Sequence, residues 1–312
     1  MKKLLALLLV FVMLFSLFAC KEEPPTPSGD GTAGGETANG GEGDSATNGT
    51  PSAPEANPAS DFEYSTMEER EGMAINKYIG TSKNLVFPET IDGLPVTVIG
   101  SYLLDDEKMP LIESVIIPDT VKIIAPRTFM GCENLKTVDF GEGVTEILES
   151  AFEGCIALEK AILPPKLETI GASAFYECTA LEEVFIPKTV TTWGRTFTRG
   201  AFGACASLTK ITIEEGLETM GFCCEFALSS SLQEIEIPAS VKKIGTQLFV
   251  GCTSLTKVVF RGNAPIVERE NELINVFGYE DFKDDLVIYY DPATEGWDTV
   301  EWRGRYRMEP LS

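Results

Sequence analysis

The chain of 312 residues is long enough for one large domain or two ordinary ones. Acidic residues outnumber basic ones 48 to 25, and a formal net charge of −23 repels nucleic acid and anionic lipid head groups. The chain has no histidine, which excludes the commonest general base and every histidine-containing metal site. We therefore predict no nucleic-acid partner, no metal and no cofactor.

The N-terminus has the pattern of an export signal. Two lysines precede an apolar run at residues 4–18, which is too short to span a bilayer comfortably. The run ends in Leu17-Phe18-Ala19-Cys20, which resembles the lipobox of bacterial lipoproteins, where cleavage precedes the cysteine and its thiol carries diacylglycerol. We predict a lipoprotein signal peptide at residues 1–19 and lipidation at Cys20. The alternative is an ordinary signal peptide followed by a chance cysteine.

A polar, low-complexity segment follows the signal. Residues 21–60 contain eight glycines and six prolines, but no aromatic residue and no Val, Ile, Leu or Met. Such a segment cannot bury apolar surface, and a flexible chain of this length spans roughly 35 Å. We predict that residues 20–60 are the lipidated cysteine and a disordered tether.

Apolar and polar residues alternate at 61–65 and 74–79, on either side of Glu-Arg-Glu-Gly72. This pattern predicts a β-hairpin. A stacked repeat protein needs its first coil covered, since an open end exposes core and unpaired strand edge. We therefore predict that residues 61–84 form an N-terminal cap.

A repeat of about 23 residues organises residues 85–260. In each coil the third and fifth residues after the start are apolar, which predicts a short strand with those side chains inward. A second apolar pair follows, and a phenylalanine closes the coil. One coil cannot bury these faces alone, so the coils must stack, with parallel strands about 4.8 Å apart. After an atypical first repeat at 85–100, the coils start at Ile112, Leu135, Leu158, Leu181, Leu208 and Leu232, with a partial coil at Leu255.

The pattern Leu-x-x-Val-x-Ile-Pro-x-x-Val-x-x-Ile-Gly-x-x-x-Phe-x-x-Cys resembles the BspA-type leucine-rich repeat family, from Asp61 to the C-terminus. The resemblance implies a β-rich solenoid, a right-handed coil with a parallel sheet on its concave face. It also implies surface exposure, and some members are adhesins that bind host or bacterial surface proteins. Residues 61–84 would cap this solenoid at one end, residues 85–260 would form it, and residues 261–312 would cap the other end.

Cysteine recurs once per coil, after the closing phenylalanine. Export favours disulfides, but each stacked cysteine has an equivalent on either side, so no unique pairing is specified. We predict buried thiols for this column: Cys132, Cys155, Cys178, Cys205 and Cys252. Cys223 and Cys224 are adjacent and break the pattern, and a redox or metal role for them stays open.

The strand side chains that point away from the core are the candidate partner-binding surface. Ile162 and Phe185 are predicted to be exposed neighbours on this face, and an apolar pair rimmed by charge suggests a protein contact. The alternative is that they favour strand formation or are covered by another segment. The candidate surface comprises Ile116, Asp139, Lys160, Ile162, Glu183, Phe185, Lys210, Thr212 and Glu236.

The coil that begins at Leu181 carries four extra residues near Trp193, Arg195 and Arg199. Insertions in a repeat array map to surface loops, so this segment is a candidate insertion loop. Its two arginines could meet a carboxylate or phosphate group, or they could pair with nearby acids. Late in the chain, Trp297, Trp302 and Tyr306 are predicted to cover the last coil, with sugar stacking as the alternative.

The sequence favours a non-enzymatic, lipid-anchored cell-surface protein, extracytoplasmic on a bacterial membrane. Its solenoid would bind another protein on a host or bacterial surface, with adhesion as one form. A carbohydrate- or cell-wall-binding module is the alternative. An enzyme is the remote alternative, because the chain has no Gly-x-Ser-x-Gly turn and no metal-ligand cluster. We assign no catalytic residue.

Overall fold

The computed structural model describes residues 54–67, 72–196, 198–267, 276–277, 285–300, 304 and 306–312. These ranges contain β-strands and two short 3₁₀ turns, η1 (Ala59–Asp61) and η3 (Met109–Leu111). No helix within them is long and apolar enough to cross a membrane. The predicted signal peptide, Cys20 and the predicted tether as far as residue 53 lie outside the described residues. The compact unit discussed below spans Pro54–Ser312.

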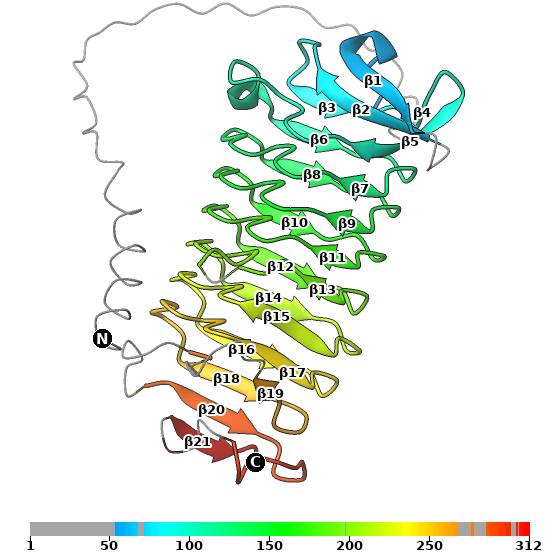
Figure 1. The fold of residues 1–312 in the computed structure, drawn as a ribbon. Helices are drawn as coiled ribbons and strands as arrows, with labels where there is room; N and C mark the ends of the chain where they lie inside the picture. Colours follow the sequence, from blue (N-terminus) through cyan, green and yellow to red (C-terminus); the bar gives the residue numbers. More distant parts are fainter. Residues whose placement is uncertain are drawn as a thin grey trace, which may run out of the picture. The chain divides into compact units, whose positions relative to one another are not determined.

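The coils stack into a β-solenoid in which each coil contributes a strand to a parallel row (Figure 1). We call this the first strand row. It is a six-stranded sheet continued beside β14 by a four-stranded one. The predicted three-plus-two step produces these strands, because alternate side chains enter the core. Its strands are β3 (Asn84–Val86), β6 (Ser114–Ile116), β8 (Thr137–Asp139), β10 (Lys160–Ile162), β12 (Glu183–Ile186), β14 (Lys210–Ile213), β16 (Glu234–Ile237), β18 (Lys257–Phe260), β20 (Val287–Tyr290) and β21 (Arg307–Pro310).

The expectation of one sheet is incomplete, because the second apolar pair of each coil also forms strands. These make a second parallel row, in which Ile147 pairs with Ile170 and Ile170 with Trp193. A strand of two residues is too short to show an alternation of apolar and polar side chains, so the sequence did not reveal this row. Its strands are β5 (Leu94–Ile99), β7 (Ile123–Ile124), β9 (Glu146–Ile147), β11 (Thr169–Ile170) and β13 (Thr192–Trp193), and then β15 (Thr219–Cys223), β17 (Lys243–Thr246) and β19 (Ile266–Val267).

The predicted N-terminal hairpin is present. Strands β1 (Phe62–Met67) and β2 (Gly72–Tyr78) pair antiparallel, and β2 adds in parallel to β5. A second, smaller hairpin joins β4 (Thr90–Ile91) to β5 and accounts for the atypical first repeat. β1 ends the second strand row, so the hairpin lies where a cap is needed.

The tether is shorter than predicted. Asn57 donates its backbone N–H to the carbonyl oxygen of Val86 at 2.8 Å, and the Val86 N–H donates to Oδ1 of Asn57 at 2.8 Å. This reciprocal pair holds residue 57 against the outer edge of β3. The composition of 54–60 gives no sign of this order, because the segment is held by hydrogen bonds from the backbone and side chain of Asn57 and by the packing of Ala59 against the core.

A column of stacked phenylalanines runs through the core. From Phe129 to Phe202 successive ring centroids are 5.2 Å apart, and two of the three steps are within 4° of parallel. The column continues through Phe226 and Phe249 and ends at Phe277. Its members are Phe129, Phe152, Phe175, Phe202, Phe226, Phe249 and Phe277.

The cysteine column lies beside these rings. Four of its five thiols donate to the carbonyl oxygen of a phenylalanine in the preceding coil, as from Cys155 to Phe129 at 3.3 Å and from Cys178 to Phe152 at 3.2 Å. Burial raises the pKa of the Cys132 thiol to about 12. All seven cysteines in the described residues are buried and reduced, which confirms the prediction of buried thiols.

The aromatic residues of the last segment face inward. Trp297 is buried, with its ring centroid 5.2 Å from those of both Phe260 and Tyr290. Tyr306 meets the edge of Phe277. Trp302 lies outside the described residues. Since the Trp297 ring is covered by protein, it offers no face for a sugar to stack on.

Candidate binding surface

The first strand row presents an exposed apolar pair. Ile162 of β10 is 74% exposed and Phe185 of β12 is 39% exposed, and the two residues are direct partners in the parallel register. Ala161 and Val184, which directly precede them in their strands and point to the opposite face, are buried, as alternation requires. Phe185 in turn pairs with Thr212 of β14. The predicted exposure of Ile162 and Phe185 is confirmed, and their binding role stays a prediction.

The neighbouring column of the same face is a ladder of alternating charge. Lys210 Nζ lies 3.5 Å from Oε2 of Glu183, and Lys257 Nζ lies 2.9 Å from Oε2 of Glu234. Exposed pairs of this kind contribute about 0–1 kcal/mol each, so they favour register more than stability. The ladder runs through Lys160, Glu183, Lys210, Glu234 and Lys257, all of which are exposed.

The remaining predicted surface residues lie further along the row. Glu236 is held by both Nε and Nη2 of Arg261 at 2.9 Å, and this bidentate pair lowers the pKa of its carboxyl. Asp139 is exposed and accepts a turn N–H from Gly141, whereas Ile116 is half-buried. All nine residues therefore lie along the first strand row. The apolar pair and Thr212 are on β10–β14, and charged residues around them form ion pairs such as Lys210–Glu183 and Arg261–Glu236.

One of the three predicted insertion-loop residues is not in the loop. Trp193 is 6% exposed, pairs with Ile170 in the second strand row and donates its ring N–H to the Thr219 carbonyl oxygen at 3.1 Å. It occupies the core column of the repeat, so the extra residues follow Gly194 instead. The sequence analysis was wrong here because a tryptophan at an isoleucine position does not look like a continuation of the column.

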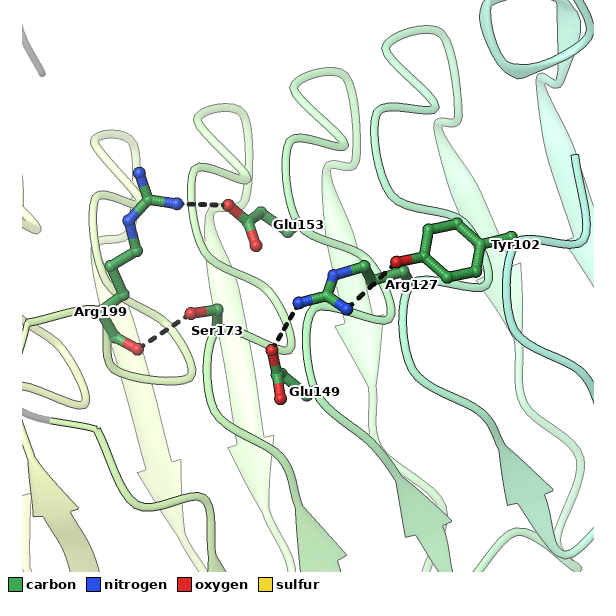
Figure 2. A network of polar contacts seen from close by, with 6 residues as sticks. All are labelled: Tyr102, Arg127, Glu149, Glu153, Ser173 and Arg199. Carbon is green, nitrogen blue, oxygen red and sulfur yellow. Dashed lines mark hydrogen bonds and ion pairs between the residues drawn. The ribbon is translucent and has the colours of Figure 1, made fainter. Parts of the chain in front are cut away.

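Both arginines of the insertion are engaged within the protein. Arg199 binds Glu153 with its Nη1 2.7 Å from Oε1, and its guanidinium lies 4.9 Å from the centre of the Tyr176 ring (Figure 2 shows the ion pair). Arg195 lies over the Phe222 ring at 4.7 Å. Pairing with nearby acids, one of the two interpretations of these arginines, is confirmed for Arg199.

The family model of the BspA type leucine rich repeat region matches six copies, over residues 97–198 and 194–271, which is more than half of the chain. The chain belongs to the BspA-type leucine-rich repeat family. A comparison with curated proteins gives no match.

Solved structures with the same repeat fold are bacterial. The Treponema pallidum leucine-rich repeat protein TpLRR is 28% identical, with a TM-score of 0.58 over 64% of this chain and 91% of that one. A leucine-rich repeat protein from Bacteroides ovatus is 22% identical, with a TM-score of 0.53 over 74% of this chain and 70% of that one. The second likeness shows the fold alone.

This leucine-rich repeat protein also carries a polar corner that the sequence analysis missed. Arg127 donates to the Tyr102 hydroxyl at 3.2 Å and to Oε1 of Glu149 at 2.8 Å (Figure 2). Arg127 has a φ of +58°, a left-handed conformation that Ser150 and Ser173 repeat in the next coils. Two serines and one arginine at equivalent positions do not form a recognisable pattern, so the corner was not visible in the sequence.

The repeat buries one carboxylate. Glu225 is fully buried and accepts backbone N–H bonds from Ala201 at 2.7 Å and Phe222 at 3.0 Å. Burial raises the pKa of Glu225 to about 7, against the opposing effect of these bonds. Glu225 directly precedes Phe226, where Ala151, Ala174 and Ala201 precede their own phenylalanines. Aligning the coils on phenylalanine would have revealed it.

Among the residues that the structure describes, no three Cys, Asp or Glu side chains gather as ligands for a metal ion.

Proposed function

We propose that this protein is a non-enzymatic cell-surface lipoprotein whose first strand row binds another protein, with the contact centred on Ile162 and Phe185. The observation that carries the proposal is the 74% exposure of Ile162 beside Phe185 in the middle of the row. Apolar and aromatic side chains of this kind are the usual energetic centres of protein interfaces, and charged residues form their rim.

The charged residues around Ile162 and Phe185 support a partner contact that does not depend on the net charge of this protein. Lys210–Glu183 and Lys257–Glu234 neutralise each other along the row, although the protein as a whole carries −23. A partner therefore meets an apolar centre with locally balanced charge. On the cell surface, such binding would attach the cell to another cell, which is adhesion.

A photo-crosslinking phenylalanine analogue at position 185 tests the contact on intact cells. We expect crosslinked products with a distinct protein, and we expect them to diminish when Ile162→Ser is added. The matched control places the analogue at Ile156, which is also exposed but lies outside the first strand row. Identical products from positions 185 and 156, or none from 185, would contradict the proposal.

A polysaccharide array with the same protein tests the carbohydrate alternative. We expect no retention on any glycan. Retention that survives Phe185→Ala with Ile162→Ser would favour the alternative over protein binding.

The proposed anchoring is tested separately. Globomycin blocks the cleavage of lipoprotein signal peptides, so we expect the uncleaved precursor to accumulate in its presence. We expect Cys20→Ser to release the protein from the membrane fraction. A lipid anchor holds a protein stably on a membrane when it carries more than one acyl chain. Unchanged fractionation of Cys20→Ser would contradict lipidation at this residue.

A further inference from the structure

Two cysteines lie outside the buried column and contact each other. The Sγ atoms of Cys223 and Cys224 are 3.2 Å apart. The column position of their coil is taken by Ser229, which is fully buried. The coil therefore keeps a small side chain in the column and places both of its thiols elsewhere, next to each other.

The pair occupies a small satellite cluster rather than the main core. Its buried members are Cys223, Cys224 and Ala227, and half-buried Phe222 and other apolar residues pack against them. The column cysteines, by contrast, belong to the continuous core of the solenoid. The pair is therefore covered by partly exposed side chains, among them Phe222, Leu228 and Val250, and not by the continuous core of the solenoid.

The two thiols share a polar neighbour, but their pKa values are shifted in opposite directions. Oε1 of Gln247 lies 3.8 Å from the Cys223 sulfur and 3.6 Å from the Cys224 sulfur. The hydrogen bond between the two thiols lowers the pKa of Cys223 despite its burial, and it raises the pKa of Cys224. In the column, burial raises the pKa of Cys205 and Cys252 to about 12. Cys223 is therefore the thiol best able to form a thiolate, and Cys224 is placed to attack it next.

We propose that Cys223 and Cys224 form a modification site that hydroperoxides oxidise to a disulfide within the pair. The Cys223 thiolate attacks one peroxide oxygen, the O–O bond breaks, and protonation of the departing oxygen releases water or an alcohol. The Cys223 sulfur is left as a sulfenic acid. The Cys224 sulfur then attacks the Cys223 sulfur, the S–O bond breaks, and the hydroxide leaves as water with the Cys224 proton. One peroxide is reduced for each disulfide formed.

The product is expected to be readily reduced. Adjacent Cα atoms across a trans peptide are about 3.8 Å apart, which is below the 4.4–6.8 Å range of ordinary disulfides. A disulfide between neighbours is therefore strained, and strained disulfides have more oxidising potentials. Cys224 already has a φ of +62°, the corner conformation of its coil, so the pair is held on a sharp bend.

The test is peptide mapping of the full folded chain after treatment with hydrogen peroxide, with thiols alkylated under denaturing conditions. We expect the peptide that contains Cys223 and Cys224 to lose two hydrogen atoms and both alkylation sites, about tenfold faster than the column cysteines lose theirs. Dithiothreitol should restore both sites. Circular dichroism before and after treatment checks that the chain stays folded.

Two variants sharpen the result. Cys224→Ser should trap Cys223 as a sulfenic acid that dimedone labels, whereas Cys155→Ser should leave the reaction of the pair unchanged. Serine at the column position is already accepted at Ser229, so Cys155→Ser is a matched control. A pair that stays reduced while the unfolded chain oxidises, equal oxidation of the column cysteines, or a disulfide from Cys223 to any other cysteine would overturn the proposal. None of these outcomes bears on the protein-binding surface, which is tested by crosslinking.

Discussion

The coils from Ile112 to Ala180 and the two coils that follow them share one hydrophobic core. They differ in length and in the polar groups that lie beside that core. In the first group each start is 23 residues after the previous one, and the next two coils are 27 and 24 residues long. Phe152 and Phe175 stack at 5.2 Å and 4°, while Phe202 and Phe226 stand 5.7 Å apart. The column stays continuous: the step across the four extra residues, from Phe175 to Phe202, is still 5.2 Å and 4°, and only the steps after Phe202 are wider.

The unusual chemistry of the protein is concentrated in the irregular coils. The buried carboxylate of Glu225, the contacting thiols of Cys223 and Cys224, and the stacked guanidinium of Arg195 all lie within residues 195–225. At the positions of Cys224 and Glu225, the two regular coils before the insertion carry only serine and alanine: Ser150 and Ala151, then Ser173 and Ala174. The irregular coils therefore hold thiols and a carboxylate beside a phenylalanine column that stays continuous, and each of the following substitutions compares the two regions.

Removing a column ring should have the largest effect. Phe175→Ala leaves a cavity between two rings that are each 5.2 Å away, and it should lower the free energy of unfolding by about 3–5 kcal/mol. Phe226→Ala should cost less, because its neighbours are 5.7 and 5.8 Å away and the site is looser. Urea unfolding followed by circular dichroism measures both, with Tyr102→Ala as the exposed control. A greater loss for Phe226→Ala than for Phe175→Ala would show that the irregular coils are packed as tightly as the regular ones.

The buried carboxylate should make stability depend on pH. The pKa of Glu225 is about 7 in the folded chain and 4.5 as a model group, so between these values the folded chain holds a proton that the unfolded chain has lost. The free energy of unfolding therefore falls as pH rises from about 4.5 to 7, by about 3 kcal/mol. Glu225→Gln should abolish this fall in urea titrations at successive pH values.

A surface carboxylate supplies the opposite control. Arg261 lowers the pKa of Glu236, so the stability it contributes is present at neutral pH and is lost as the solution becomes acidic. Glu236→Gln should leave the fall between pH 4.5 and 7 in place. If Glu225→Gln and Glu236→Gln alter the profile in the same direction, the carboxyl of Glu225 is not protonated in the folded chain.

The arginines on the surface should matter least. Arg199→Ala removes an exposed ion pair with Glu153 and a contact with Tyr176, and Arg127→Ala removes the equivalent contacts in a regular coil. Each should cost less than about 1 kcal/mol, or roughly 2–4 °C in melting temperature. Calorimetry compares them directly. A much larger loss for Arg199→Ala would mean that this pair holds the insertion in place, which its counterpart in a regular coil does not need to do.

The sequence alone determined the repeat, the inward residues and the outward ones. Because the coils repeat in register, one assignment of inside and outside applies to all of them, and Ile162, Phe185 and the column cysteines were placed correctly on that basis. The closing phenylalanines followed from the same pattern.

Tertiary structure decided what the period cannot specify. Trp193 lies before the extra residues and takes the position of an isoleucine, and its packing in the second strand row shows that the insertion begins after Gly194. Hydrogen bonds from the backbone and side chain of Asn57 to the Val86 backbone order Asn57, and stacking creates strands of two residues in the second row. The contact between Cys223 and Cys224 and the burial of Glu225 depend on how neighbouring coils close around the inserted residues, and no single coil contains that information.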